Sequence, residues 1–151
     1  MNRVIAVNRR ARHEYFIEET YEAGLVLSGT EVKSIRGGHV SLAEAFARID
    51  NGEAWIHNMQ ISPYEQGNRY NLPPTRKRKL LLHKSQISTL IVKTQAKGMT
   101  LVPLQLYFKR GHAKIELGVG RGKKLHDKRE TIAKRDTQRE IQRALRERNK
   151  A

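Results

Sequence analysis

The chain has 151 residues, 30 of them Lys or Arg and 15 Asp or Glu, so its formal net charge is +15. This excess of positive charge favours a polyanionic partner, with nucleic acid as the first candidate and an anionic membrane as the second. The sequence has no cysteine, which excludes disulfides and thiolate chemistry, and it has neither a run of about 20 apolar residues nor a secretory signal, so we expect a cytoplasmic protein with no membrane partner.

The first part of the chain predicts strands. Residues 3–7 (RVIAV) are typical of a short strand, and residues 14–27 are rich in aromatic and β-branched side chains that partly alternate. We expect residues 14–27 to form one long strand, or two strands joined by a bend at 22–24, because Gly24 tolerates a bulge.

A short helix and a hairpin should follow. Ser28 or Thr30 can cap the helix, and the glycines at 37–38 should end it. Asn51-Gly52 is the dipeptide that type I′ turns prefer, and alternating apolar residues flank it on both sides. Residues 45–59 therefore predict a β-hairpin.

The second half of the chain predicts a surface loop, a strand, a helix and a second hairpin. The loop holds three of the four prolines, Gly98 should end the helix, and Arg110-Gly111 should turn the hairpin. In this hairpin the alternation of Leu104, Leu106 and Phe108 predicts one apolar face. In chain order the expected elements are the loop 62–75, the strand 79–82, the helix 84–97 and the hairpin strands 100–108 and 113–119.

Six or seven short strands and two helices around a modest core predict a mainly β fold with flanking helices, closed or nearly closed into a barrel. An OB-like barrel fits this pattern, and so does an SH3-like one. We expect residues 1–120 to form the barrel and residues 121–151 to form a separate basic tail. The first part carries a net charge of +8 and the tail +7.

The tail has too little apolar area to offset the entropy of ordering it. Its large apolar residues are few, and only Ile141, Ala144 and Leu145 form a local helical stripe. The other residues are good helix formers. We therefore expect a tail that is disordered alone and helical when it lies on an anionic surface.

Nothing in the sequence favours an enzyme. The six histidines lack the spacing of metal ligands, so we expect neither a metal nor a cofactor. The segment GVGRGKK fails the phosphate-loop pattern, because Leu117 stands where the first glycine belongs and Lys124 where Ser or Thr belongs. Its three alternating glycines suggest a flexible exit from the barrel.

Compact basic clusters instead favour RNA. NRRAR (8–12), TRKRK (75–79) and GRGKK (120–124) are candidate phosphate-binding segments. The chain has only nine Phe, Trp and Tyr residues, and several alternate as core residues do. Because single-strand binders need exposed aromatic side chains, we expect structured RNA rather than a single strand.

Three long stretches resemble the small protein B family, the SsrA-binding proteins of bacterial trans-translation. They are NRRARHEYFIEETYEAGLVLSGTEVKSIR, PTRKRKLLLHK and GKKLHDKR. The resemblance runs in the family's order from Asn8 to Arg129, and beyond residue 130 it is one of composition. It implies an OB-like barrel with flanking helices and a C-terminal tail that is disordered in the free protein.

The resemblance also implies a function. Members of the family bind the tRNA-like domain of transfer-messenger RNA (tmRNA) and fill the volume of the anticodon arm that this RNA lacks. On a stalled ribosome the tail lies in the empty mRNA channel near the decoding centre, and the nascent peptide is tagged for degradation. The implied partners are tmRNA and the ribosome, with elongation factor Tu and alanyl-tRNA synthetase reached through tmRNA. We expect a monomer.

Four positions match family positions tied to the tmRNA-binding surface: Asn8, His13, Glu22 and Leu81. Glu22 could accept a hydrogen bond from a base or orient neighbouring basic groups, and Leu81 could be either core or surface. Further candidates for phosphate contact, chosen by charge, are Arg9, Arg10, Lys33, Arg36, Arg76, Lys77 and Lys79.

The resemblance assigns tail residues to the ribosome. His126 could stack on a decoding-centre base, and the apolar Ile141 and Leu145 could dock the tail. Many relatives have an aromatic residue where this chain reads Arg135-Asp136-Thr137. The tail candidates are Lys123, Lys124, His126, Asp127, Lys128, Arg129, Ile141 and Leu145.

Two alternatives stand beside a ribosome-rescue adaptor. A ribosomal or assembly protein would bind ribosomal RNA permanently, and composition alone does not separate it from an adaptor. An RNA-processing enzyme with a basic tail would need a metal or acid–base constellation, which the sequence lacks.

Overall fold

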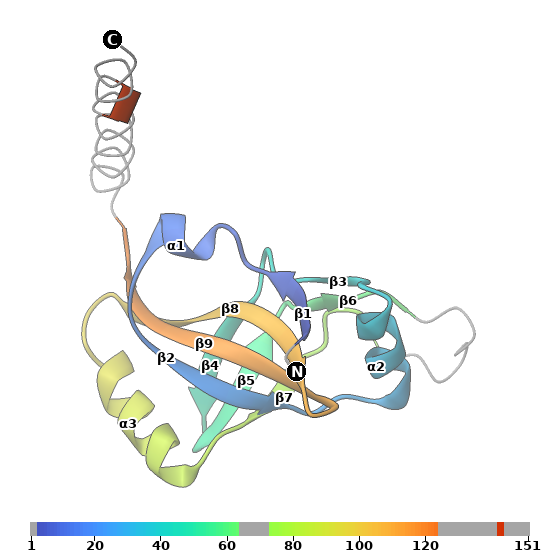
Figure 1. The fold of residues 1–151 in the computed structure, drawn as a ribbon. Helices are drawn as coiled ribbons and strands as arrows, with labels where there is room; N and C mark the ends of the chain where they lie inside the picture. The colour runs from blue at the N-terminus through green and yellow to red at the C-terminus, as the bar shows by residue number, and fades with distance from the viewer. Residues whose placement is uncertain (1–2, 64–72, 124–141, 144–151) are drawn as a thin grey trace.

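The computed structural model describes residues 3–63, 73–123 and 142–143 (Figure 1). Within these residues, strands predominate and three helices flank them. In chain order the elements are β1 (Arg3–Val7), α1 (Ala11–Glu14), β2 (Tyr15–Leu25), α2 (Gly29–Arg36), β3 (Val40–Ser41), β4 (Phe46–Asp50), β5 (Glu53–His57), β6 (Gln60–Ile61), β7 (Arg78–Leu81), α3 (Lys84–Thr94), β8 (Met99–Lys109) and β9 (His112–Gly122).

The main sheet closes into a barrel. Its strand order is β1-β8-β4-β5-β7-β2-β9, and β9 also pairs with β8. The pairing of β8 with β9 joins the two sides of the sheet into a ring of six strands, and β1 extends the free part of β8. Closure removes the exposed edges that an open sheet would present. The prediction of a mainly β, OB-like barrel with flanking helices is confirmed.

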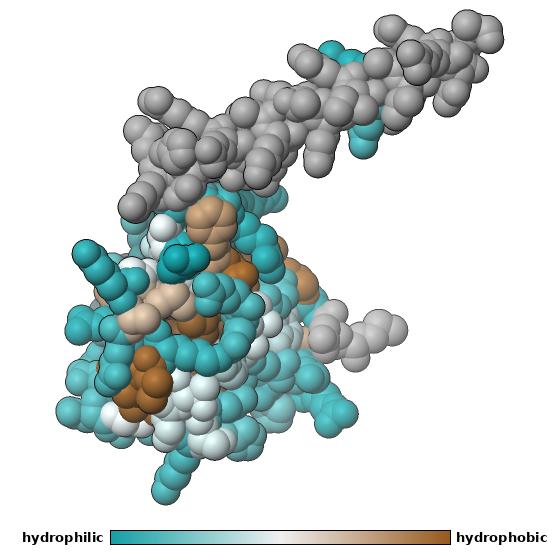
Figure 2. Space-filling model, turned by 90° about the vertical axis from the view of Figure 1, so that its left-hand side faces the viewer, coloured by the Kyte–Doolittle hydropathy of each residue, from teal (hydrophilic) through white to brown (hydrophobic). Residues whose placement is uncertain are grey.

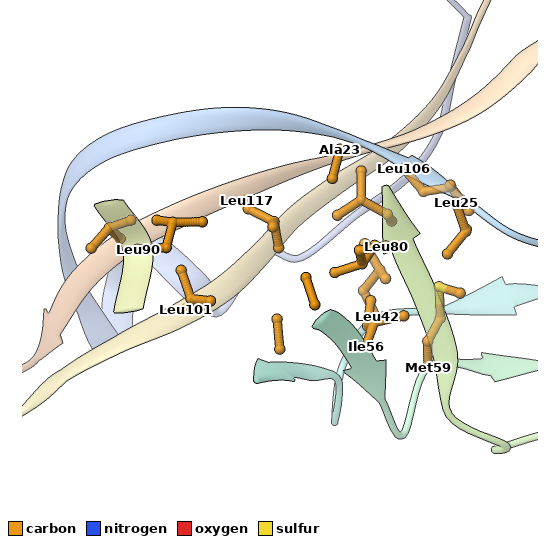
Figure 3. Packing of buried hydrophobic residues seen from close by; sticks show 14 of the residues in the cluster. Ala23, Leu25, Leu42, Ile56, Met59, Leu80, Leu90, Leu101, Leu106 and Leu117 are labelled. Carbon is orange, nitrogen blue, oxygen red and sulfur yellow. The ribbon is translucent and has the colours of Figure 1, made fainter. Parts of the chain in front are cut away.

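Apolar side chains from every strand of the ring fill the barrel (Figure 3). The helices close its ends, because Leu90 of α3 and Ile35 of α2 are fully buried in the same cluster. Each Leu or Ile buried in this way stabilises the fold by about 1.5–3 kcal/mol. In Figure 1, α3 and α2 lie at opposite ends of the barrel.

The two hairpin predictions are confirmed. Asn51 and Gly52 both have positive φ, 50° and 74°, as a type I′ turn requires. Arg110 and Gly111 repeat this pattern with φ of 52° and 79°. The first turn sets the register in which Ile49 pairs with Ala54. The core-facing side chains of β4 therefore lie opposite the core-facing side chains of β5.

Of the two alternatives predicted for residues 14–27, one long strand is confirmed, and the bend at 22–24 is wrong. β2 runs without interruption from Tyr15 to Leu25, and its ladder with β9 shifts register between Ile17 and Glu19 instead of at residues 22–24. Gly24 pairs with Leu81 of β7, and a Cβ on it would lie 3.2 Å from the Cβ of Leu81. The glycine therefore allows close strand packing and does not form a bulge.

A second irregularity lies in β8. The register of β8 against β9 shifts between Pro103 and Gln105, which reverses the alternation of side chains. Leu106 and Phe108 contact the barrel core, whereas Leu104 packs beneath α1 in a small separate cluster with Ala11 and Val102. The prediction that Leu104 shares a face with Leu106 is wrong for this reason.

The glycines near the end of the barrel are ordered parts of β9. Gly118 and Gly120 pair with both β2 and β8. A Cβ on Gly120 would lie 2.2 Å from the carbonyl oxygen of Phe16, so the two backbones approach too closely for any side chain. The expectation of a flexible exit is wrong here, and the strand continues to Gly122, two residues past the expected barrel boundary.

Glu31 joins α2 to the segment that leads into β7. Ser28 and Glu31 form a capping box, in which the Ser28 Oγ accepts from the Glu31 N–H and the Glu31 Oε1 accepts from the Ser28 N–H. This selects Ser28 over Thr30 as the cap. The same carboxylate, only 5% exposed, pairs with Arg76 and with the buried Arg78.

Arg78 finds a partner for each of its guanidinium nitrogens. Its Nε lies 2.5 Å from Glu31, its Nη1 donates to the carbonyls of Met59 and Arg76, and its Nη2 donates to the Pro74 carbonyl. These bonds satisfy the buried charge, which would otherwise cost several kcal/mol. Two arginines of the TRKRK cluster thus hold the fold together.

The third helix is shorter than expected. α3 ends at Thr94, three residues before the predicted end at 97, and Gly98 with φ of 80° belongs to the turn into β8. Leu90 is buried while Ile91 is exposed, so the apolar stripe contacts the barrel along one edge only.

Candidate RNA-binding surface

Outward-facing side chains of β7, β2, β9 and β8 form one continuous surface, here called the polar face. Ala23 and Leu25 point into the core, so the alternating Glu22 points outward. The ladders place Glu22 beside Glu116, and Glu116 beside Gln105. The polar face consists of Leu81, Glu22, Lys114, Glu116, Gln105, Tyr107 and Lys109.

The Glu22 carboxylate is held by donors from β8. The Tyr107 hydroxyl donates to Glu22 Oε2 at 2.5 Å, and the Lys109 Nζ lies 3.4 Å from both carboxylate oxygens. The Tyr107 hydrogen bond is the largest cause of a lowered Glu22 pKa, opposed by partial burial and assisted by Lys109. Glu22 is therefore an oriented anion at neutral pH.

The contact with Glu22 also keeps the Tyr107 hydroxyl protonated, so it remains a hydrogen-bond donor. Its side chain is buried, and burial together with the Glu22 carboxylate raises the pKa of the phenol well above its ordinary value. The phenol is therefore protonated at neutral pH. Glu22 keeps free acceptor capacity, because an ionised carboxylate offers about four lone-pair positions.

Glu22 and Leu81 border the same cleft. Its walls also include Gly24, Leu82, His83, Gln86 and Lys114. Leu81 is 53% exposed, so it is a surface residue and not part of the core. An anionic acceptor, an apolar wall and a cation side by side can bind the amino edge of a nucleobase, its ring and a phosphate.

Asn8 fixes the basic segment next to the polar face. Its N–H donates to the Leu104 carbonyl at 2.8 Å and its Nδ2 donates to the Pro103 carbonyl at 3.0 Å. The Asn8 carbonyl in turn accepts from the Ala11 N–H at the start of α1. The side chain of Asn8 is therefore bound to the barrel itself.

The cations that follow Asn8 face solvent. Arg9, Arg10, Arg12 and His13 are all exposed on the loop and on α1. The Arg12 guanidinium lies 4.0 Å from Glu116 of the polar face, and a second cleft joins Arg9 and Arg12 to Gln105 and Glu116. The basic segment and the polar face therefore form one surface, on which the family-derived positions Asn8, Glu22 and Leu81 lie, and His13 is exposed on α1 next to Arg12.

The other predicted cations are divided among several places. Lys33 is exposed on α2, and the Arg36 guanidinium lies 5.9 Å from the Phe108 ring, near one end of the polar face. Lys77 and Lys79 lie beside β5, where Lys77 covers Trp55 and Lys79 pairs with Glu53 at 3.5 Å. Arg76 is half-buried against Glu31, so its charge is already paired.

Lys123 attaches the end of β9 to the barrel. Its N–H donates to the Glu14 carbonyl at 2.6 Å, its Nζ donates to the Arg12 carbonyl at 3.0 Å, and the Nζ lies 4.8 Å from the Phe16 ring centroid. The other tail candidates lie outside the described residues: Lys124, His126, Asp127, Lys128, Arg129, Ile141 and Leu145.

Sequence reasoning did not single out Gln105, Tyr107, Lys109, Lys114 or Glu116. Their alternation with Leu106, Ile115 and Leu117 was a signal that they face outward. Their position beside Glu22 depends on the register of three strands, which no local pattern gives.

The expectation of few spare aromatic side chains is wrong in two places, at Phe16 of β2, which is 41% exposed, and at Phe46 of β4. Phe46 and His57 face outward from β4 and β5, and their rings stack with centroids 5.0 Å apart and planes at 8°. Phe46 is 39% exposed. Their alternation with the buried Ala47 and Ile56 already indicated this orientation.

The described part of the chain offers little for other site classes. It contains no group of three or more histidine and carboxylate side chains that could hold a metal ion, and no helix in it has the length and apolar character to span a membrane. On the face that Figure 2 presents, hydrophilic side chains surround small separate apolar areas. This surface suits a polar, charged partner.

Comparisons with known proteins identify the family of the chain. The family model described as "SmpB protein" matches residues 5–147. Relatives named "SsrA-binding protein" include those of Halalkalibacterium halodurans, 62% identical over 98% of this chain and 96% of the relative, and Carboxydothermus hydrogenoformans, 63% identical over 98% and 99%. That of Acetivibrio thermocellus is 65% identical over 96% of this chain and 94% of the relative.

A solved structure described as "tmRNA-SmpB: a journey to the center of the bacterial ribosome" contains a similar chain. The TM-score is 0.68 with 53% sequence identity, over 83% of this chain and 92% of the other. The family match extends over most of the sequence, and the relatives are similar along nearly their whole length. The chain belongs to the SmpB protein family.

Proposed function

We propose that this protein is the tmRNA-binding adaptor of trans-translation, and that its polar face together with the basic segment from Asn8 to His13 binds the tRNA-like domain of tmRNA. The observation that carries the proposal is the shared cleft of Glu22 and Leu81, 59 residues apart in sequence yet on adjacent strands. The family and its SsrA-binding relatives name the RNA.

The chemistry of the surface suits a folded RNA. Glu22 is anionic and oriented, so it selects an amino group that a phosphate cannot offer. Arg9, Arg10, Arg12 and His13 can contact the backbone around that point. An anion surrounded by cations favours RNA that presents a base edge at one fixed place and phosphates around it.

The basic tail has a different role in this proposal. Residues 121–151 carry nearly half of the net charge, and a cationic, helix-capable segment suits the RNA-lined mRNA channel when no message occupies it. The barrel binds tmRNA and the tail reports an empty channel. The protein acts as a monomer in the cytoplasm, is not an enzyme, and meets elongation factor Tu and alanyl-tRNA synthetase through tmRNA.

A reconstituted translation system tests the adaptor role. Ribosomes are stalled on a message without a stop codon, tmRNA is supplied, and incorporation of the tag into the nascent peptide is measured. The full chain should support tagging. A chain that ends after Lys123, which keeps all of β9 and its anchor, should bind tmRNA within about twofold of the full chain and should not support tagging. Tagging by the shortened chain would contradict the tail's role.

Two controls separate the alternatives. Pure protein incubated with tmRNA and Mg²⁺ should leave the RNA intact and unmodified, whereas cleavage would favour an enzyme. Salt-washed ribosomes should retain the protein only when tmRNA is present. Retention without tmRNA would favour a permanent ribosomal component.

A further inference from the structure

α1 belongs to the RNA-binding surface, yet it cannot be stable by itself. It has only four residues, from Ala11 to Glu14, and a single helical turn does not form in water without tertiary contacts. The residue at its N-cap position, Arg10, makes no side-chain capping hydrogen bond. The place of α1 on the barrel therefore depends on contacts with other elements.

Two of these contacts hold the N-terminal end of α1. Ala11 is 2% exposed and packs with Val102 and Leu104 beneath the helix. The Ala11 N–H also donates to the Asn8 carbonyl. Both contacts act on the first residue of the helix, so they do not hold its C-terminal end.

Lys123 holds the C-terminal end of α1. Its N–H donates to the Glu14 carbonyl at 2.6 Å, and its Nζ donates to the Arg12 carbonyl at 3.0 Å. The last carbonyls of a helix have no partners within the helix, and a cation placed beside them also interacts favourably with the helix dipole. In Figure 1 the end of β9 passes beside α1. Lys123 therefore caps a helix whose Arg12 lies 111 positions earlier in the sequence.

The ring of Phe16 directs the Lys123 side chain to this position. The Nζ lies 4.8 Å from the ring centroid, within the range of a cation–π interaction. Phe16 is 41% exposed, so its ring adds little to the barrel core. This exposed aromatic side chain thus supports the lysine that caps α1.

Arg12 is held at two points by β9 and the residue that follows it. Its guanidinium lies 4.0 Å from the Glu116 carboxylate, while its carbonyl accepts from the Lys123 Nζ. The Gln105 Nε2 donates to the other carboxylate oxygen of Glu116 at 2.8 Å. These contacts place α1 at the border of the polar face.

We propose that Lys123 is a positioning residue for RNA binding, which holds α1 in place for the RNA and does not itself contact RNA. Without its Nζ, α1 would leave this place for part of the time, and the affinity would fall with the fraction of molecules in which the helix is positioned. This role differs from the direct ribosome contact that the family resemblance assigns to Lys123. The proposal rests on the proposed function only for tmRNA as the RNA that meets the cations on and before α1: Arg9, Arg10, Arg12 and His13.

Hydrogen exchange tests the effect of Lys123 on α1 without any RNA. Lys123→Met keeps the backbone donor to Glu14 and removes the Nζ. Exchange of the amides of residues 8–16 in the free full chain, measured by mass spectrometry, should become about threefold faster or more. Lys124→Met removes the same charge from the next residue and should exchange like the unmodified chain. Equal exchange in Lys123→Met and the unmodified chain would overturn the proposal.

Binding to tmRNA across a salt series tests the consequence. Lys123→Met should bind about 3- to 10-fold more weakly than the unmodified chain, with the same salt slope as Lys124→Met, because no phosphate contact is lost. Lys123→Arg, which can donate to the Arg12 carbonyl and lie over Phe16, should restore the affinity. An equal loss in Lys124→Met, a salt slope lower by about one in Lys123→Met alone, or no recovery in Lys123→Arg would overturn the proposal.

The two measurements also separate this proposal from the proposed function. Failure of the unmodified chain to prefer tmRNA over bulk tRNA would contradict the proposed function. The exchange of α1 in the free protein requires no RNA, so its result depends on Lys123 alone.

Discussion

At the scale of single residues, the orientation of Glu22 depends on one hydroxyl group from another strand. Tyr107→Phe removes the donor of the 2.5 Å hydrogen bond while keeping the buried ring. We expect tmRNA binding to weaken by roughly 3- to 10-fold, because Lys109 still faces the carboxylate and only part of the roughly 1.5–3 kcal/mol of a hydrogen bond to a charged group should be lost. Equilibrium binding of the variant measures this loss.

Tyr21→Phe is the matched control. It removes a hydroxyl that donates to Glu19 at 2.9 Å, away from the cleft, and it should leave tmRNA binding unchanged. Equal losses in the two variants would show that the Tyr107 hydroxyl has no specific role. An unchanged affinity of Tyr107→Phe would show that Glu22 needs no orientation from β8.

The buried carboxylate of Glu31 makes stability depend on pH. Burial alone would raise the Glu31 pKa, but donation from Arg76, the Ser28 N–H and Arg78 outweighs it and lowers the pKa. A carboxyl with a lowered folded-state pKa stabilises the fold above its ordinary pKa near 4.5, and this stabilisation is lost as pH falls through the folded-state value.

Glu31→Gln should therefore cost about 3 kcal/mol or more at pH 7, because Arg78 is left buried without its counter-charge. The difference from the unmodified chain should shrink below about pH 4. Urea denaturation across this pH range measures both. Glu53→Gln, which disrupts the exposed pair with Lys79, should cost less than about 1 kcal/mol, and a similar cost for both variants would contradict the assigned role of Glu31.

The site residues named from sequence stay predictions, but the structure shows where they lie. Glu22 and Leu81 share a cleft, as a common surface requires. Arg76 and Lys77 are adjacent in sequence and equally cationic, yet one is paired internally and the other is exposed. Burial determines which of these two cations is paired inside the fold. It depends on how closely α2 approaches the segment that leads into β7.

At the scale of elements, the contact of β9 with β2 requires a glycine. The Cβ of Gly120→Ala would lie 2.2 Å from the backbone oxygen of Phe16, which cannot move without opening the ladder. We expect a loss of about 1–3 kcal/mol or more in the free energy of unfolding, measured by urea denaturation.

Gly29→Ala is the control for this substitution. A Cβ at Gly29, in the first turn of α2, would meet nothing within 4 Å. Because Ala favours the helix over Gly, the variant should be as stable as the unmodified chain or more stable by up to about 1 kcal/mol. An equal loss in both variants would show that the close approach at Gly120 is not the cause.

Elements with a strong local signal were predictable, and irregular ones were not. Asn51-Gly52 determines its turn through the positive φ of both residues. The register shifts at Ile17–Glu19 and Pro103–Gln105 arise from the pairing of β2, β8 and β9. The two-residue strands β3 and β6 and the four-residue α1 are too short to show a period.

At the scale of the whole molecule, closure of the barrel brings side chains from distant parts of the chain onto one outer surface. The polar face is built from β7, β2, β9 and β8, and the segment that starts at Asn8 borders it. Composition predicted an RNA partner from the net charge of +15, but it could not divide that charge between surfaces. The division follows from the strand order, which only the folded chain shows.

The end of β9 connects the barrel to the tail. Lys123 binds the carbonyls of Glu14 and Arg12, so the chain leaves the barrel at the junction of α1 and β2. A shortened chain must therefore end after Lys123 and not at Gly120. Ending at Gly120 would remove the last pairs of β9 with β2 as well as the tail.

The central claim is that the polar face selects tmRNA, and competition binding tests it most directly. The full chain and its Leu81→Ala variant are titrated with tmRNA, with bulk tRNA as competitor, across a series of salt concentrations. We predict that the full chain prefers tmRNA at every salt concentration, and that Leu81→Ala binds it about tenfold more weakly with an unchanged salt slope. Equal affinity of the full chain for both RNAs, with a steep salt slope, would mean general phosphate attraction and would contradict the account.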